Sequence, residues 1–142
     1  MKRRDSLLRL KRFRVDDLKR RIATLDEMRA DLDKKLADLD DSVTRERARA
    51  NDSDIGRLAF PSFLQSIDVR RKNIRTTMAD LERERDQQQN DLAAAFQDLK
   101  AFEIAEEERV RRAAEAEDRA AQSRLDEMAI VRHLRKHSVR QV

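Results

Sequence analysis

The 142-residue sequence contains no cysteine, one glycine and one proline, and it lacks tryptophan and tyrosine. Without cysteine, neither a disulfide framework nor a thiolate metal site can form. Nothing in the chain then requires an oxidising compartment, so we expect a cytoplasmic location. The five phenylalanines are its only aromatic residues, which are too few for an ordinary globular core.

Long hydrophobic runs are also missing. No stretch approaches the ~18 consecutive apolar residues that a membrane span needs. The basic start at Met1 to Arg4 is followed by Asp5 and alternating charges, unlike the apolar core of a signal peptide. Charged residues make up 44% of the chain and apolar residues 39%. This composition is typical of long helices rich in Ala, Glu, Lys, Arg and Leu.

The charge is unevenly distributed. Residues 1–20 hold nine Lys or Arg against three Asp, and residues 131–142 hold four basic residues and no acidic one. Because the formal net charge is only +4, residues 21–130 are mildly acidic. An acidic partner surface would therefore be met at the two ends of the chain.

Turn-forming residues gather at one place, from Asn51 to Gly56 and around Pro61. Glycine and proline are the strongest helix breakers, so their absence elsewhere permits two uninterrupted helices. We expect helix 1 at about 5–49, a turn at about 50–61, and helix 2 at about 62–137. Pro61 would then lie in the first turn of helix 2, with a nearby Asp or Ser as the cap.

Apolar residues follow an alternating three-and-four spacing, which is typical of a coiled-coil seam. In the first helix the seam comprises Leu8, Val15, Leu18, Ile22, Leu25, Leu32, Leu36, Leu39 and Val43. In the second helix it comprises Ile67, Ile74, Met78, Leu81, Leu92, Ala95, Leu99 and Phe102, with Arg71, Arg85 and Gln88 as polar interruptions.

The two seams can pack on each other if the chain folds back at the turn. Val43 would then face Ile67, Leu36 would face Ile74, Leu18 would face Leu92 and Leu8 would face Phe102. We therefore predict an all-α fold, a long two-helix antiparallel coiled-coil hairpin in one domain (1–142). Because the seams match within one chain, we expect a monomer. The second helix is the longer, and its residues from about 105 to 137 have only a thin seam of alanines.

Catalytic and metal-binding patterns are scarce. Glu106, Glu107 and Glu108 are adjacent carboxylates, but no phosphate-binding loop or nucleophile motif accompanies them. His133 and His137 are one helical turn apart, yet the neighbouring residues are basic and would repel a cation. We expect no enzymatic activity, cofactor, metal or small-molecule substrate.

The basic residues from Lys2 to Arg20 could bind an acidic protein surface, an anionic lipid surface or a nucleic acid. The scarcity of aromatic residues argues against nucleic-acid binding by base stacking. Phe60 and Phe63, flanked by Leu58 and Leu64, could either staple their own turn or dock a partner.

Four segments resemble the flagellar FliJ proteins of α-proteobacterial type. These are Arg4 to Phe13 followed by Val15-Asp16, Ala59 to Phe63, Ala95 to Lys100 leading into Glu103, and Leu125 to Ala129. The resemblance implies a non-enzymatic component of the flagellar type III protein export apparatus, in which an antiparallel coiled coil resembles the stalk subunit of rotary ATPases. Its implied partners are the hexameric export ATPase, the membrane-embedded export gate and substrate chaperones, and through them it would lie at the cytoplasmic face of the inner membrane.

On this reading we predict two partner-binding surfaces. The ATPase-binding residues would be Leu7, Arg9, Leu10, Arg12 and Lys19, and those of the hairpin tip would be Leu58, Phe60, Phe63 and Leu64. The alternative is a structural or nucleic-acid-associated coiled coil with basic ends. The basic tail from His133 and the polar seam of the second helix depart from the family pattern.

Overall fold

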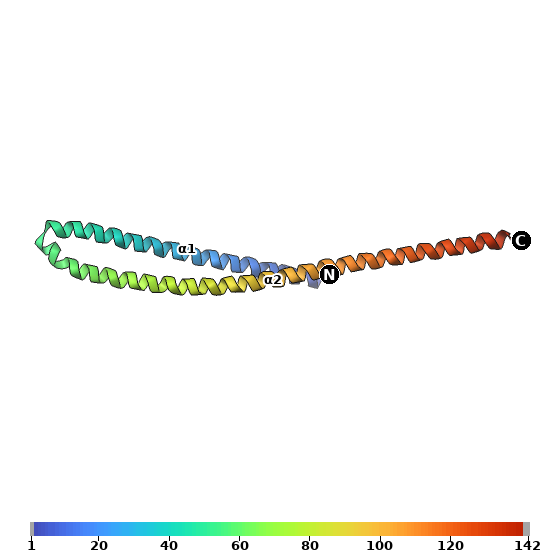
Figure 1. Cartoon of the computed structure of the whole chain (residues 1–142), viewed down its shortest axis with the longest axis horizontal. Helices are drawn as coiled ribbons and strands as arrows, with labels where there is room; N and C mark the ends of the chain where they lie inside the picture. The colour runs from blue at the N-terminus through green and yellow to red at the C-terminus, as the bar shows by residue number, and fades with distance from the viewer. Residues whose placement is uncertain (1, 141–142) are drawn as a thin grey trace. The chain divides into compact units, whose positions relative to one another are not determined.

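Two α-helices account for almost the whole chain (Figure 1). The computed structural model describes residues 2–140, of which α1 spans Lys2–Asp52 and α2 spans Asp54–Arg140. No strand occurs among these described residues. The prediction of an all-α fold with a longer second helix is therefore confirmed.

The connection between the helices is a single residue, Ser53. Its side-chain Oγ accepts a hydrogen bond of 2.9 Å from the backbone N–H of Gly56, and its carbonyl accepts one of 3.1 Å from the N–H of Arg57. Ser53 is thus the N-cap of α2, and Asp54 places an acidic side chain in the first turn, where the helix dipole favours it.

This cap corrects the predicted helix limits. The turn is much shorter than 50–61, because α1 continues to Asp52 and α2 begins eight residues before position 62. Pro61 accordingly lies inside α2 and not in its first turn. Proline removes the hydrogen bond that the carbonyl of Arg57 would otherwise accept, so packing at the tip must offset that loss.

Gly56 allows the backbone to turn this tightly. A Cβ atom at this position would lie 2.8 Å from Ser53 Oγ, 3.0 Å from Ala50 Cα and 3.1 Å from the carbonyl oxygen of Arg49. Two of these neighbours are backbone atoms, which cannot move aside like a flexible side chain. The one glycine of the sequence therefore stands where the start of α2 lies close to the backbone at the end of α1.

The chain divides into two units, Met1–Gln97 and Asp98–Val142. The first unit is the hairpin, in which α1 lies alongside the first part of α2, drawn in green and yellow in Figure 1. The second unit consists of the remaining part of α2. The prediction of a single domain over 1–142 stays a prediction, as does the pairing of Leu8 with Phe102, which belong to different units.

Within the first unit, every residue of the predicted seams is buried or half-buried. The most buried are Val15, Leu18, Ile22, Leu25, Val43, Ile67 and Leu81. Burial of these side chains removes apolar surface from water at one stripe of each helix, which holds the two helices together.

Two ion pairs between the helices show that α1 and the first part of α2 run antiparallel. Arg71 Nη2 lies 2.5 Å from Asp40 Oδ1, and Arg85 Nε lies 2.7 Å from Asp26 Oδ1. Moving from Asp40 to Asp26 along α1 takes fourteen residues, and moving from Arg71 to Arg85 along α2 takes the same number in the opposite sense. This register differs by one residue from the predicted facing of Val43 and Ile67, which is within the stagger of a coiled coil.

Candidate partner-binding surfaces

All five predicted ATPase-binding residues are exposed on α1. Leu7 and Leu10 are exposed apolar residues, and Leu10 retains 62% of its accessible surface. Arg9, Arg12 and Lys19 are also exposed. We call Leu7, Arg9, Leu10, Arg12 and Lys19 the N-terminal surface. The seam residues Val15 and Leu18 are buried, whereas these five residues are exposed, so the N-terminal surface is not used by the hairpin core.

Phe13 extends this surface and was missing from the prediction. It is exposed, and the guanidinium carbon of Arg20 lies 5.8 Å from its ring centroid. Residues three apart on a helix are neighbours, so Phe13 continues the row of Leu7 and Leu10. That spacing was the signal in the sequence that could have identified it.

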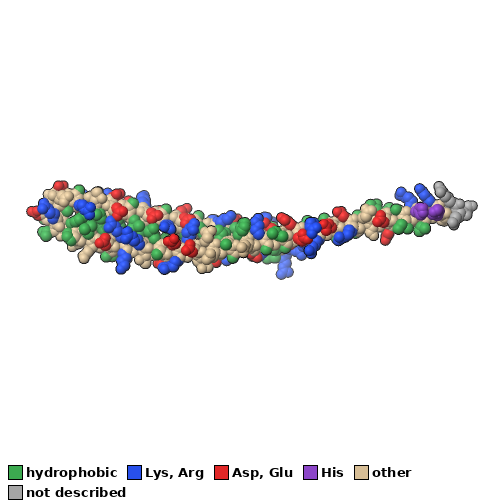
Figure 2. All heavy atoms as spheres, in the orientation of Figure 1, with side chains coloured by type: hydrophobic (Ala, Val, Ile, Leu, Met, Phe, Trp, Pro, Cys, Tyr) green, Lys and Arg blue, Asp and Glu red, His purple; other side chains and the backbone are tan. Residues whose placement is uncertain are grey.

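The electrostatic potential near the start of α1 is positive for two reasons. The first twenty residues carry nine basic side chains against three acidic ones. The helix dipole also places a partial positive charge at an N-terminus. One of the three acidic residues, Asp17, pairs with a basic residue outside this stretch, since Arg21 Nε lies 3.1 Å from Asp17 Oδ2. Figure 2 shows that acidic and basic side chains are mixed along the visible face of the hairpin. The net positive charge of the hairpin is therefore confined to the start of α1.

At the hairpin tip the aromatic residues pack within the protein. The rings of Phe60 and Phe63 are stacked with their centroids 6.4 Å apart, and the guanidinium carbon of Arg47 from α1 lies 5.8 Å from the Phe60 centroid. Phe60, Phe63 and Leu64 are all half-buried. This packing fits a staple for the turn, and the binding of a partner by Phe60, Phe63 and Leu64 stays a prediction.

Leu58 differs from the other predicted tip residues because 82% of its surface is exposed. Ile55, three residues earlier, is 81% exposed and was not predicted. Ile55 falls within the predicted turn at about 50–61, whereas the Ser53 cap places it in the first turn of α2. Ile55 and Leu58 together form an exposed aliphatic pair, which we call the tip pair.

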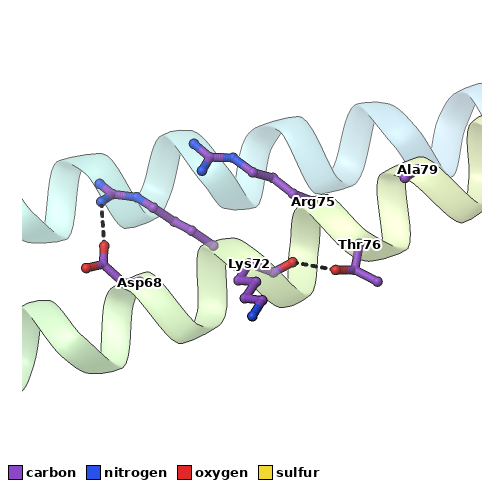
Figure 3. Close-up of a pocket in the computed structure, with 6 residues that line it drawn as sticks. Asp68, Lys72, Arg75, Thr76 and Ala79 are labelled. Carbon is purple, nitrogen blue, oxygen red and sulfur yellow. Dashed lines mark hydrogen bonds and ion pairs between the residues drawn. The ribbon is translucent and has the colours of Figure 1, made fainter.

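A shallow groove runs along α2 in the first unit and is lined by Asp68, Arg71, Lys72, Arg75, Thr76 and Ala79 (Figure 3). Arg71 lies between Asp68 at 3.5 Å and Asp40 of α1. The Thr76 hydroxyl donates a 2.9 Å hydrogen bond to the carbonyl of Lys72, so it is held by its own helix. Four of the six lining residues are charged, namely Asp68, Arg71, Lys72 and Arg75.

Two of the three adjacent carboxylates of the second unit, Glu106 and Glu108, are engaged in ion pairs along α2. Glu106 Oε2 lies 3.2 Å from Arg109, and Glu108 interacts with both Arg111 and Arg112. The hydrogen bond from Arg111 lowers the pKa of Glu108, and nearby Arg112 acts in the same direction. Glu108 is therefore held ionised on a helix face.

His133 and His137 meet edge to face, with their ring centroids 4.6 Å apart. Across residues 2–140, no group of three or more His, Asp or Glu side chains is placed to hold a metal ion. Within the same range, neither helix has an apolar stretch with the length and hydropathy of a membrane-spanning segment.

Comparison with known proteins identifies the family. A family model described as flagellar FliJ protein matches residues 1–138 of the 142. No curated protein and no solved structure matches the chain. The resemblance drawn from the opening and tip segments is thus confirmed. The chain belongs to the flagellar FliJ protein family, and it is a protein of the flagellar export apparatus.

Proposed function

We propose that this protein is a non-enzymatic adaptor that binds the hexameric export ATPase through the N-terminal surface. The observation that supports this most is the separation of roles on α1. The seam from Val15 to Leu25 is used by the hairpin, while Leu7, Arg9 and Leu10 face solvent. A second partner can therefore bind these residues without unfolding the hairpin.

Several contacts must act together at such a surface. An exposed ion pair contributes under ~1 kcal/mol, so no single basic residue can hold the ATPase. Apolar anchors supply most of the affinity in protein interfaces, and charged residues around them mainly set orientation and association rate. Leu10 and Phe13 fit the first role, and Arg9, Arg12 and Lys19 fit the second.

The test is a triple substitution of Arg9, Arg12 and Lys19 to Glu. Because these side chains are exposed, helicity by circular dichroism should hardly change. Binding to the export ATPase should weaken at least about tenfold, which corresponds to about 1.4 kcal/mol. A matched control replaces Lys34, Lys72 and Arg75 with Glu, which gives the same change in net charge at exposed sites elsewhere. Equal weakening by both triples would show a general charge effect and remove the proposed surface.

We further propose that the tip pair binds a second component of the apparatus, namely the export gate or a substrate chaperone. The support is that Ile55 and Leu58 are more exposed than any other large hydrophobic residue among those described. The double substitution Ile55→Gln and Leu58→Gln should weaken capture of the gate while ATPase binding is retained. Loss of ATPase binding in this variant would reverse the assignment of the two surfaces.

In this proposal the protein acts in the cytoplasm as a monomer and reaches the inner membrane face through its partners. The alternative is a nucleic-acid-associated coiled coil, which the nine basic residues of positions 1–20 favour. Salt separates the two proposals. Binding to a phosphate backbone should weaken linearly in the logarithm of salt concentration with a steep slope, whereas a mixed apolar and charged protein contact should depend on salt far less.

A further inference from the structure

The last turns of α2 combine exposed apolar and basic side chains. Met128, Ile130, Val131 and Leu134 are all exposed, with Ile130 at 59% and Leu134 at 60% of their full accessible surface. Arg132, Arg135 and Lys136 are exposed as well. Glu127 is the last acidic residue of the sequence, so this stretch has no acidic partner within itself. We call residues 128–139 the C-terminal segment.

Helix geometry separates the two kinds of side chain. At about 100° per residue, Ile130, Leu134 and Val131 fall within an arc of about 100°. Arg132, His133 and Lys136 lie outside this arc, and Met128 and Arg135 lie at its edge. Figure 2 shows the same separation near the end of the chain, with Lys and Arg side chains along one edge of the helix and hydrophobic side chains along the other. The C-terminal segment is therefore a basic amphipathic helix.

An anionic lipid bilayer can contact both the apolar and the basic side chains of such a helix. The apolar arc can enter the boundary between headgroups and acyl chains, while the long basic side chains extend back to the headgroups. A second copy of the segment would bring Arg132 and Lys136 near their own counterparts, and like charges repel. A nucleic acid would satisfy the basic side chains but leave the apolar arc in water.

We propose that the C-terminal segment binds anionic lipid bilayers directly as an interfacial helix. Ile130 and Leu134 are its central apolar anchors, since they lie one turn apart on the same stripe. Arg132 and Lys136, also one turn apart, contact the anionic headgroups. Met128 and Val131 line a shallow groove with three arginines and one acidic residue, so mainly basic side chains also flank the apolar stripe; these neighbours are Arg124, Arg132, Arg135 and Glu127. This contact adds to the membrane association through partner proteins and does not depend on it.

The experiment measures binding of the full chain to phosphatidylcholine vesicles with and without about 30% phosphatidylglycerol, by flotation at low salt. The unaltered chain should bind the anionic vesicles at least tenfold more tightly than the neutral ones. The double substitution Ile130→Gln and Leu134→Gln should weaken binding to anionic vesicles at least tenfold. Arg132→Gln with Lys136→Gln should weaken it severalfold. All variants should keep their helicity, because every changed side chain is exposed.

The tip pair supplies the matched control. Ile55→Gln with Leu58→Gln removes the same two residue types, which are even more exposed but lie beside Asp52 and Asp54. This variant should bind anionic vesicles like the unaltered chain. The proposal is overturned if the chain does not bind anionic vesicles, if the control and the Ile130 and Leu134 variant weaken equally, or if only basic substitutions matter. If vesicles are not bound but the Ile130 and Leu134 variant loses ATPase binding, the segment is a protein-binding face instead.

Discussion

Replacing Gln88 with leucine should stabilise the hairpin. Gln88 is a half-buried seam residue of α2 that shares a groove with Leu25 and Met28. Its side-chain Oε1 is buried and accepts no hydrogen bond from the described residues. A buried polar atom without a partner costs about 1–3 kcal/mol, and leucine at a seam position removes that cost while it adds apolar contact.

The expected gain is therefore about 1–3 kcal/mol in the free energy of unfolding, or a rise in Tm of about 3–10 °C. Thermal unfolding followed by circular dichroism measures it. The control is Gln89→Leu, which changes the same residue type at the next, exposed position and should shift Tm by less than about 1–2 °C. An unchanged or lower Tm for Gln88→Leu, or an equal rise for both variants, would refute the assignment of Gln88 to the buried seam.

Three further predictions concern the turn, the interhelical ion pairs and the second unit. Gly56→Ala should lower Tm despite a gain of about 1 kcal/mol in helix propensity, because the new Cβ would lie 3.0 Å from Ala50 Cα. A rise in Tm would show that the turn has room to relax. A double-mutant cycle for Asp40→Ala and Arg71→Ala should give a coupling free energy below ~1 kcal/mol, which decreases as salt is added. This coupling energy should still exceed that of the Asp80 and Arg83 pair, which is more exposed. Equal couplings would contradict the ion pair's role in the register. The lowered pKa of Glu108 means that its contribution to helix stability is present above about pH 4.3 and is lost as pH falls through the lowered value. An acid titration of helicity should therefore be shallower for Glu108→Gln than for the unaltered chain, and identical curves would contradict this.

The hairpin could be predicted from the seam, because residues at the three-and-four spacing lie on one stripe of each helix and are buried when the two helices pack together. Val15, Leu18 and Ile67 occupy seam positions in the sequence and are buried in the structure. The polar seam residues Arg71 and Arg85 looked like interruptions, but their long side chains leave the seam and pair with Asp40 and Asp26. Their partners are far away in sequence, so only the register of the folded hairpin could reveal them.

The helix limits at the turn could not be predicted in the same way. Glycine and proline near one another suggested a long turn, whereas the Ser53 cap and the close packing at Gly56 end it after one residue. The exposure of the tip residues depended on that detail. Once α2 begins at Asp54, Phe60 and Phe63 stack against the hairpin while Ile55 and Leu58 remain in solvent.

Site-specific photo-cross-linking most directly tests the claim that the N-terminal surface binds the export ATPase. Benzoylphenylalanine is introduced in place of Leu10 in one variant and of Leu58 in another, both at exposed positions. With purified export ATPase, the proposal predicts a cross-linked product from the Leu10 position and little or none from the Leu58 position. A product from Leu58 alone would place the ATPase at the tip and contradict the proposal.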